Sequence, residues 1–169
     1  MPDTQALFVF VTAAGVARSA GEVVRGALAV GWEVYGVATP NVAAVVPPRR
    51  VFAVPGCTWI RDYGQSPLER FPFGTMLVAP CTFNTFNKLA LGLADNLVTA
   101  MVADALGAGC PVVVAPAMNR RLWQHPQTRR SAEQLAAWGC RIVAPEVTYT
   151  SVAMADMPTI LAHLGAPPP

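Results

Sequence analysis

The chain of 169 residues is 53% apolar and 13% charged, with a formal net charge of +2 at pH 7. This length suits one domain with a sizeable core and is short for two. We therefore expect a single domain over residues 1–165 and a disordered tail, residues 166–169. The basic residues form scattered pairs without interleaved aromatic residues, which argues against nucleic acid as a partner. No apolar stretch reaches the roughly 20 residues that span a membrane, so no membrane partner is expected.

The cysteines show no C-x-x-C spacing and no histidine close to them in the sequence; they are Cys57, Cys81, Cys110 and Cys140. This pattern disfavours a metal site or a disulfide framework and favours free thiols in a reducing compartment. The segment before the first apolar run contains Asp3 and no Lys or Arg, so it does not resemble a signal peptide. The sequence therefore predicts a cytoplasmic protein without a bound metal.

The first elements predicted along the chain form a β-α-β unit. Residues 7–11 are a short apolar run typical of a strand buried on both faces, and residues 16–30 carry small and apolar residues at helical spacing. Gly31 is well placed to end that helix, and residues 32–39 repeat the strand pattern.

The next stretch, residues 47–73, is rich in proline and is predicted mostly as loop, with room for one short strand at residues 51–54. After it the alternation resumes, with strands at 75–79, 112–115 and 142–144 and helices at 84–106 and 120–138. Continuously apolar strands that alternate with helices indicate a parallel sheet covered on both faces. The fold class that we expect is α/β, a three-layer doubly wound parallel sheet of the Rossmann-like type.

Three of the apolar runs end in the same triplet, Val-Ala-Pro, at Pro80, Pro116 and (within Ile-Val-Ala-Pro) Pro145. Proline removes a backbone donor and starts a turn at fixed φ, so we expect these prolines to stop three neighbouring strands at one edge. Ligands of doubly wound sheets bind beyond the carboxyl ends of the strands, where helix N-termini present free N–H groups. The residues after the prolines are therefore the candidate site.

The segment after the first of these prolines offers hydroxyl, carboxamide and ammonium groups on Thr82, Asn84, Thr85 and Lys88. With helix N-terminal amides, they suit a phosphate or a polar heterocycle. Helix capping by Thr82 or Asn84 is the simpler explanation for either residue alone, and this alternative stays open. Asp95 and Asn96 are polar residues in an otherwise apolar segment, and they serve either a ligand or a helix or subunit contact.

Several common motifs are missing. The first turn, TAAGVARSAG, lacks G-x-G-x-x-G, and no acidic residue follows the second strand, which disfavours a nicotinamide dinucleotide and favours a mononucleotide. There is no P-loop, no G-x-S-x-G elbow and no histidine near a Ser or Cys nucleophile in a known pattern. His125 is interpreted as a surface residue.

Two ordered motifs resemble those of a known family. PCTFNT at residues 80–85, followed by NKLALGLADNL, corresponds to Pro-Ala-Ser-Ala-Asn-Thr and its continuation. PAMNRRLW at residues 116–123 corresponds to Pro-x-Met-Asn-x-x-Met-Trp, with Leu122 in place of Met. On these motifs the chain resembles the homo-oligomeric flavin-containing cysteine decarboxylases, which include phosphopantothenoylcysteine decarboxylases and the peptidyl-cysteine decarboxylases of lantibiotic biosynthesis. The resemblance extends from the first β-α turn to residues 153–156.

The resemblance implies an FMN cofactor that lies across the strand ends of a flavoprotein. The implied cofactor-binding residues are Ala14, Gly15 and Val16 in the first turn, Thr39 and Asn41 after the second strand, Thr82, Phe83, Asn84 and Thr85 at the phosphate and ring edge, and Ala117 beside the isoalloxazine. Asn119 corresponds to the residue that holds the cysteine carboxylate of the substrate, with Met118 beside it, and the implied catalytic residues are Asn84 and Asn119. The resemblance also implies a homo-oligomer, a trimer or a multiple of trimers.

The implied reaction is the oxidative decarboxylation of a cysteine, foremost the C-terminal cysteine of a peptide. Direct loss of carbon dioxide would leave a carbanion without delocalisation. Hydride transfer from the carbon that bears sulfur to FMN gives a thioaldehyde, which accepts the electron pair as carbon dioxide departs and yields an ene-thiolate. An uncharged Asn suits this chemistry, because a strong ion pair would stabilise the carboxylate that must be lost.

The chain departs from the family at two functional positions. Family members carry an essential His before the first motif, and the equivalent segment here, QSPLERF, has none; Asp62, Tyr63 and Glu69 are the alternatives nearby. The late cysteine of the pantothenate-pathway enzymes is also missing from residues 145–156, which argues against that route. Cys81 stands where the family has Ala and is interpreted as a small buried filler.

Three hypotheses stay open at this point. In the first, the protein is an FMN-dependent cysteine decarboxylase with an altered base. In the second, it is a flavoprotein that performs other redox work or only binds FMN. In the third, it is a non-catalytic partner that lends Asn119 to a subunit that carries the His, because family active sites form between neighbouring protomers.

Overall fold

The computed structural model describes residues 5–167. Of the tail that was expected to be disordered, residues 168–169 lie outside the described residues. Within the described part of the chain, no helix combines the length and apolar character needed to cross a membrane.

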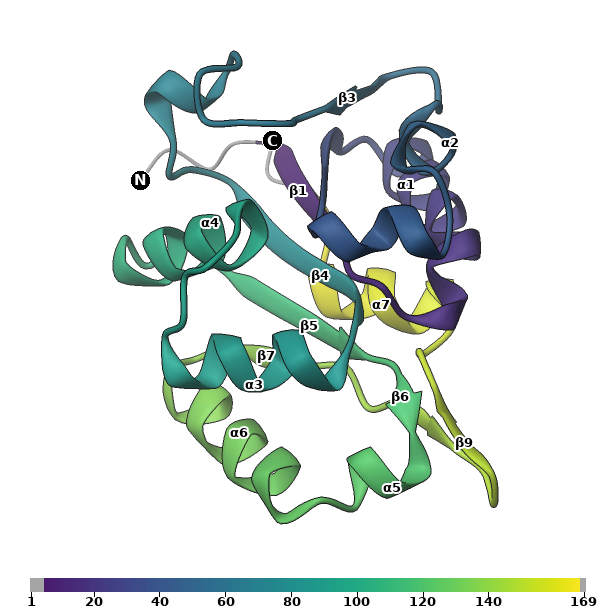
Figure 1. Ribbon diagram of the computed structural model, residues 1–169. Helices are drawn as coiled ribbons and strands as arrows, with labels where there is room; N and C mark the ends of the chain where they lie inside the picture. Colours follow the sequence, from purple (N-terminus) through teal and green to yellow (C-terminus); the bar gives the residue numbers. More distant parts are fainter. Residues whose placement is uncertain (1–4, 168–169) are drawn as a thin grey trace.

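The main element is a six-stranded sheet in the order β3-β2-β1-β4-β5-β7, in which every pairing is parallel (Figure 1). Its strands are β1 (Ala6–Val11), β2 (Glu33–Ala38), β3 (Cys57–Trp59), β4 (Thr75–Cys81), β5 (Val112–Pro116) and β7 (Arg141–Ile142). The chain builds outward from β1 to β3, then crosses back to β4 and continues in the other direction. The strand order therefore reverses between β1 and β4, and this is the switch point where doubly wound sheets bind ligands.

Helices cover both faces of the sheet, as the α/β prediction required (Figure 1). One face packs against α1 (Ala20–Ala29), α2 (Pro48–Phe52) and α7 (Met157–Leu164), and the other against α3 (Phe83–Leu91), α4 (Leu97–Gly107) and α6 (Pro126–Ala137). Alternate residues of β1 supply the two cores: Leu7 and Val9 face the first set of helices, while Phe8 and Phe10 face the second. Burial on both faces explains why the strand is continuously apolar.

The helix expected over residues 84–106 is two helices, α3 and α4. Gly92 adopts a left-handed φ of +67° and ends α3, a conformation that glycine adopts at little cost. Asn96 then begins α4 with a capping box, in which its side chain accepts from the amide of Thr99 and the Thr99 hydroxyl accepts from the amide of Asn96. The apolar pattern runs across the break because both helices pack on the same face.

Other boundaries also differ from prediction. The helix expected over 120–138 is divided into α5 (Arg120–Trp123) and α6, because Pro126 begins a new helix. The helix expected over 16–30 begins as a 3-10 turn, Gly15–Ser19, before α1. Of residues 51–54, where a short strand was considered, the first two are the end of α2, and the strand of this region is β3. The strand expected over 142–144 is β7, which begins one residue earlier and ends at Ile142.

The three prolines do not all stop their strands. Only Pro116 is the last residue of its strand, since β4 continues through Pro80 to Cys81 and β7 ends before Pro145. A shift in register between Val78 and Cys81 lets β4 pass the proline, which has no N–H to contribute to the ladder. The prediction that the three strands are neighbours with a common carboxyl edge is nevertheless correct.

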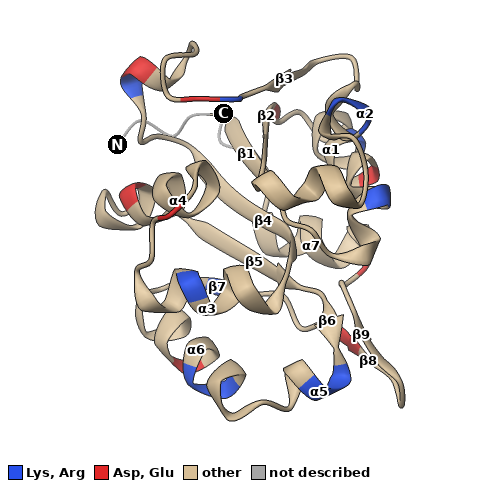
Figure 2. Ribbon diagram, in the orientation of Figure 1, with Lys and Arg blue, Asp and Glu red and all other residues tan. Residues whose placement is uncertain are grey.

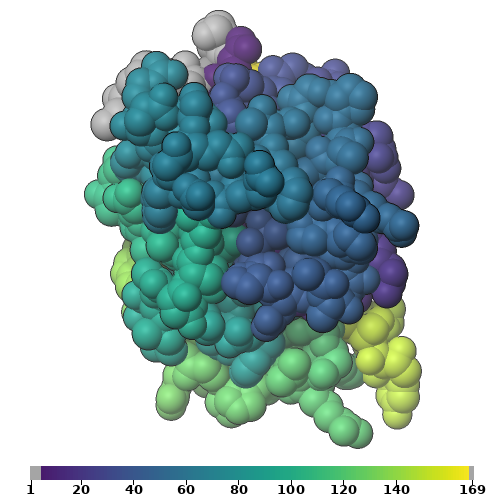
Figure 3. All heavy atoms as spheres, turned by 45° about the horizontal axis from the view of Figure 1, so that its top comes forward, coloured from purple at the N-terminus to yellow at the C-terminus, as the bar shows by residue number. Residues whose placement is uncertain are grey.

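A second, antiparallel sheet was not predicted. It has the order β6-β9-β8 and comprises β6 (Met118–Asn119), β8 (Glu146–Val147) and β9 (Ser151–Ala153). Its short strands cross the carboxyl edge of the main sheet and bring residues near 150 beside residues near 119. In the space-filling view, the segments coloured for residues near 120 and near 150 project from the body of the molecule (Figure 3).

Candidate functional site

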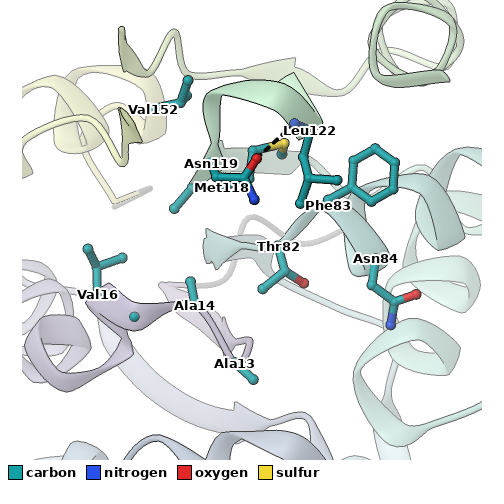
Figure 4. Close-up of a pocket in the computed structure, with 12 residues that line it drawn as sticks. Ala13, Ala14, Val16, Thr82, Phe83, Asn84, Met118, Asn119, Leu122 and Val152 are labelled. Carbon is teal, nitrogen blue, oxygen red and sulfur yellow. Dashed lines mark hydrogen bonds between the residues drawn. The ribbon is translucent and has the colours of Figure 1, made fainter. Parts of the chain in front are cut away.

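A cavity of about 500 Å³ lies at the carboxyl edge of the sheet, at the β1–β4 switch point; we refer to it as the reaction cavity (Figure 4). Its lining residues come from the turn after β1, the start of α3, the segment from β6 into α5, and β9: Ala13, Ala14, Gly15, Val16, Thr82, Phe83, Asn84, Ala117, Met118, Asn119, Leu122 and Val152. Most of these side chains are apolar, and the polar ones are Thr82, Asn84 and Asn119.

The side chain of Asn119 is held in a defined orientation. It is the N-cap of α5, and its Oδ1 accepts a hydrogen bond from the backbone N–H of Leu122 at 2.9 Å. Because the oxygen is used in the cap, the NH₂ group is left to face the reaction cavity, as the close-up shows (Figure 4). Asn119 is exposed, so this donor pair is accessible to a ligand.

The backbone of Thr82 is held in place by Thr12, a buried residue that directly follows β1. The Thr12 hydroxyl donates to the carbonyl of Pro80 at 2.7 Å and accepts from the amide of Thr82 at 2.9 Å. These bonds join the ends of β1 and β4, the two strands on either side of the switch point. Thr12 therefore positions the start of α3 without lining the cavity.

Thr82 and Asn84, for which helix capping was the simpler explanation, differ in their positions relative to α3. Thr82 is the N-cap of α3, with its Oγ1 accepting from the amide of Thr85 at 3.3 Å. Asn84 lies inside α3, is exposed and lines the site, with its side chain directed away from Asn119 (Figure 4). The capping explanation is thus correct for Thr82 and wrong for Asn84.

A second cavity of about 360 Å³ adjoins the first and shares Ala13, Thr82 and Asn84 with it; we refer to it as the polar cavity. Its other lining residues are Thr39, Pro40, Asn41, Thr85, Lys88, Asp95 and Asn96. Lys88 Nζ lies 2.5 Å from Asp95 Oδ2, and Asn96 caps α4. Asp95, in the loop between α3 and α4, thus pairs with α3, and Asn96 caps its own helix; both also line this cavity.

The structure brings together every site residue that the resemblance implied. Ala14, Gly15, Val16, Thr82, Phe83, Asn84, Ala117, Met118 and Asn119 line the reaction cavity, while Thr39, Asn41 and Thr85 line the polar cavity. The two cavities adjoin along the residues that they share.

Sequence reasoning missed several lining residues. Ala13 and Pro40 neighbour predicted residues and were within reach of the argument, but Val152 was not, because only the antiparallel pairing of Met118 with Val152 places β9 at the cavity. His125 caps α6 and its ring packs edge-on against Phe83, with centroids 5.5 Å apart. It is exposed, as expected, yet it contacts a residue of the site.

The alternatives to the family His do not reach the site within this chain. Asp62, Tyr63 and Glu69 lie between β3 and β4, at the edge of the sheet where β4 begins, whereas the reaction cavity lies where β4 ends (Figure 1). The Asp62 carboxylate instead accepts from the amide of Gly64 at 2.6 Å. Among the described residues, no acidic side chain lines the reaction cavity.

Burial raises the pKa of each cysteine thiol above its usual range, to about 11 for Cys57 and for Cys140. Cys81 is fully buried, as expected of a small filler, although it directly precedes the site. All four thiols are free and stay protonated near neutral pH, so none is an activated nucleophile. Within residues 5–167, no cluster of three His, Cys, Asp or Glu residues is arranged to hold a metal ion.

The donor set of the two cavities fits a flavin mononucleotide. Ala14 and Val16 offer an apolar surface to a flat ring system, and Figure 4 shows them facing Asn119 and Met118 across the cavity. The first amides of α3, on Phe83 and Asn84, have no intrahelical partner by position, and with the hydroxyls of Thr82 and Thr85 they suit a phosphate. Each cavity by itself has a volume in the range of small-molecule sites.

Comparison with known proteins agrees with the resemblance seen in the two motifs. A mouse protein named phosphopantothenoylcysteine decarboxylase is 39% identical over 98 residues, which are 54% of this chain and 47% of that protein. The chain spans about half or less of the length of the curated relatives that it matches.

Solved structures match over most of the chain. A structure described as a PPC decarboxylase mutant complexed with pantothenoylaminoethenethiol has a TM-score of 0.80 and 24% identity, and covers 95% of this chain and 96% of its own. An FMN-dependent cysteine decarboxylase, SpaF, has a TM-score of 0.73 and 28% identity, with 95% and 94% covered. The fold is that of the Rossmann-like flavoproteins. The model of the Flavoprotein family matches residues 2–164, and the chain belongs to this family.

Proposed function

We propose that the protein binds FMN and catalyses the oxidative decarboxylation of a cysteine, foremost the C-terminal cysteine of a peptide, through a thioaldehyde to an ene-thiol. The family membership, the decarboxylase names of the relatives and the lining of the two cavities support this proposal.

The observation that carries the proposal is the orientation of Asn119. Its amide oxygen is committed to the cap of α5, so only N–H donors face the reaction cavity. Two N–H donors without charge bind a carboxylate and release it readily as carbon dioxide, because a neutral amide stabilises the carboxylate less than a guanidinium or ammonium group would. A substrate carboxylate that is to be lost is well matched to this group.

The remaining residues of the reaction cavity position cofactor and substrate. Ala14, Gly15, Val16, Phe83 and Ala117 would bind the ring system, and the amides and hydroxyls at the start of α3 would bind the phosphate. Bound FMN supplies the two-electron oxidation of the carbon that bears sulfur. Asn84 and Met118 would contact the substrate and cofactor edges and exclude water from the reacting carbon.

We also propose the wider setting implied by the family. Residues 1–165 form the functional domain, the protein works as a homo-oligomer, a trimer or a multiple of trimers, and its protonated free thiols suit the cytoplasm. A neighbouring protomer is the source that remains for a group acting as base, since Asp62, Tyr63 and Glu69 lie away from the cavity of their own chain.

A second candidate function is favoured by the position of Asp62, Tyr63 and Glu69 away from the reaction cavity. Without a base of its own at the reaction cavity, the chain would serve as an FMN-binding subunit that lends Asn119 to a partner carrying a His. This candidate predicts FMN binding and no turnover by the protein alone. Other redox work by the bound flavin predicts bleaching by other reductants and none by cysteine peptides.

The test is the visible absorbance of the FMN-loaded protein under anaerobic conditions, before and after a peptide that ends in cysteine is added. Bleaching of the flavin, with loss of carbon dioxide and two hydrogens from the peptide by mass spectrometry, supports the decarboxylase. A flavin spectrum that stays unchanged supports the second candidate or other redox work, and bleaching by other reductants then distinguishes the two. A protein that does not bind FMN on reconstitution contradicts both.

A further inference from the structure

A third cavity of about 680 Å³ adjoins the reaction cavity; we refer to it as the arginine cavity. It is lined by Asn119, Arg120, Arg121, Gln124, Tyr149 and Thr150. Asn119 lines both this cavity and the reaction cavity, so the two cavities adjoin at this residue.

The charge of this cavity is positive and unneutralised. No acidic residue lines it, and the ion pairs among the described residues are Lys88–Asp95 and Arg129–Glu133, neither of which involves Arg120 or Arg121. Figure 2 shows the basic residues of α5 together at the edge of the molecule where β6 meets β9. An anionic ligand would therefore meet two cations without displacing a carboxylate of the protein.

Arg120 is held in place before any ligand binds. Its Nη1 donates to the carbonyls of Thr148 and Tyr149 at 3.0 and 3.1 Å, and its guanidinium lies 5.6 Å from the centroid of the Tyr149 ring. These contacts fix the turn between β8 and β9 over α5, and this turn forms the outer wall of the cavity. Since only Nη1 is used, the other guanidinium N–H groups stay available, and ordering this side chain costs a ligand little entropy.

Arg121 has a different role, because within the described residues its side chain makes no hydrogen bond or ion pair and is exposed. The guanidinium group of Arg121 is thus free to donate hydrogen bonds, beside the guanidinium group of Arg120, which is held in place. Planar guanidinium groups bind carboxylates and phosphates through paired hydrogen bonds.

We propose that the arginine cavity binds an anionic group of the substrate, a carboxylate or a phosphate, at a position other than the cysteine carboxylate. This inference rests on the proposed function and names the substrate class: cysteine peptides or derivatives with a second negative charge. The two anions of such a substrate meet different groups for a physical reason. The neutral Asn119 amide holds the carboxylate that is lost, while the arginines hold the charge that is kept and so supply binding energy throughout the reaction.

The experiment compares peptides that end in cysteine and differ in one charge. Glu is placed at each of the three positions before the cysteine and is paired with Gln, and phosphoserine is paired with serine at the same positions. For the FMN-loaded protein we expect kcat/KM to be about tenfold higher for at least one anionic member of a pair, and the ratio to fall as salt is added.

Two matched arginine variants locate the effect. Arg121→Gln should reduce the anionic-to-neutral ratio to about one. Arg130→Gln, which removes the same charge from the exposed surface of α6 outside the three cavities, should leave the ratio as it is. Arg120 is not the primary test because its substitution also releases the β8–β9 turn.

The outcomes separate this inference from the proposed function. A preference for the Glu peptides alone identifies a carboxylate, a preference for phosphoserine alone identifies a phosphate, and either supports the inference. Equal kcat/KM within every pair, or a ratio that survives Arg121→Gln, overturns it while decarboxylation stands. If no peptide is turned over, the proposed function fails. The anion site is then tested by fluorescence anisotropy of the labelled peptides on the FMN-loaded protein, and the affinities of the anionic and neutral members of each pair are compared in place of kcat/KM.

Discussion

The amide oxygen of Asn119 accepts from the backbone N–H of Leu122, and this single bond determines which end of the side chain a substrate meets. The side chain of Asn119 has two roles that a variant can separate: its oxygen caps α5, and its NH₂ group faces the reaction cavity. A side chain that carries only acceptors at position 119 can keep the cap and remove the donors.

The substitution Asn119→Asp should keep α5 capped and abolish decarboxylation. A carboxylate still accepts from Leu122, but it replaces two donors by a negative charge beside the substrate carboxylate. We expect kcat/KM to fall by about 100-fold or more, with FMN affinity retained. Asn119→Ala is the matched control and should in addition lower the free energy of unfolding by about 1 kcal/mol through loss of the cap. Substantial activity in Asn119→Asp would remove the carboxylate-holding role.

The buried hydroxyl of Thr12 should matter for both stability and cofactor affinity. In Thr12→Val, the amide of Thr82 loses its partner and the carbonyl of Pro80 keeps only the longer bond to the Thr12 amide, 3.2 Å. We expect the free energy of unfolding, measured in urea, to fall by about 1 to 3 kcal/mol and FMN to bind more weakly. Thr12→Ser preserves both bonds and should behave much more like the parent protein; equal losses in Ser and Val would show that the hydroxyl is not responsible.

The break between α3 and α4 should depend on the left-handed conformation of Gly92. Gly92→Ala places a Cβ in open space but in a conformation at φ +67° that L-residues adopt at a cost, so we expect a loss of about 1 kcal/mol in the free energy of unfolding. Gly107 of α4 also has open space around its Cβ position and lacks a positive φ. Gly107→Ala should therefore be neutral or slightly stabilising. A similar loss in both variants, by thermal or urea unfolding, would contradict the conformational explanation.

Stability should decline in alkaline solution because of the buried thiols. The pKa of Cys57 and of Cys140 is raised by burial from 9.0 to about 11 in the folded protein, so the folded state keeps protons that the unfolded state releases. The stabilisation is complete below about pH 9 and is lost as the pH rises toward about 11, by roughly 2 to 3 kcal/mol for each thiol. Urea unfolding at a series of pH values measures it.

The alkaline effect can be assigned with a variant that lacks these two thiols. The double variant Cys57→Ala, Cys140→Ala should show a shallower decline over the same range. The decline that is left includes the titration of Tyr35, whose pKa is raised to about 12 by burial and by the hydrogen bond that its hydroxyl donates to the Glu33 carboxylate. An unchanged slope in the double variant would show that the two thiols do not contribute.

The sequence by itself determined the fold class, the order of the main elements and the family. Residues 7–11 are apolar at every position because both faces of β1 are covered, and a local pattern of this kind is visible without the structure. The two motifs likewise identify the neighbouring carboxyl ends of β4 and β5, since strand-to-helix turns are local in the chain. Helix ends were less well predicted, because the apolar stripe of α3 and α4 continues across Gly92 while the backbone does not.

Tertiary structure alone decided what stands around those motifs. Val152 reaches the reaction cavity, and Tyr149 the arginine cavity, only through the pairing of β9 with β6, which joins residues about thirty positions apart. The direction of the Asn119 amide depends on a hydrogen bond. Glu69 lies away from the site because it comes before the start of β4, whereas the site lies at the end of that strand. Pairings and orientations of this kind arise from contacts between distant segments, so they leave no periodic pattern in the sequence.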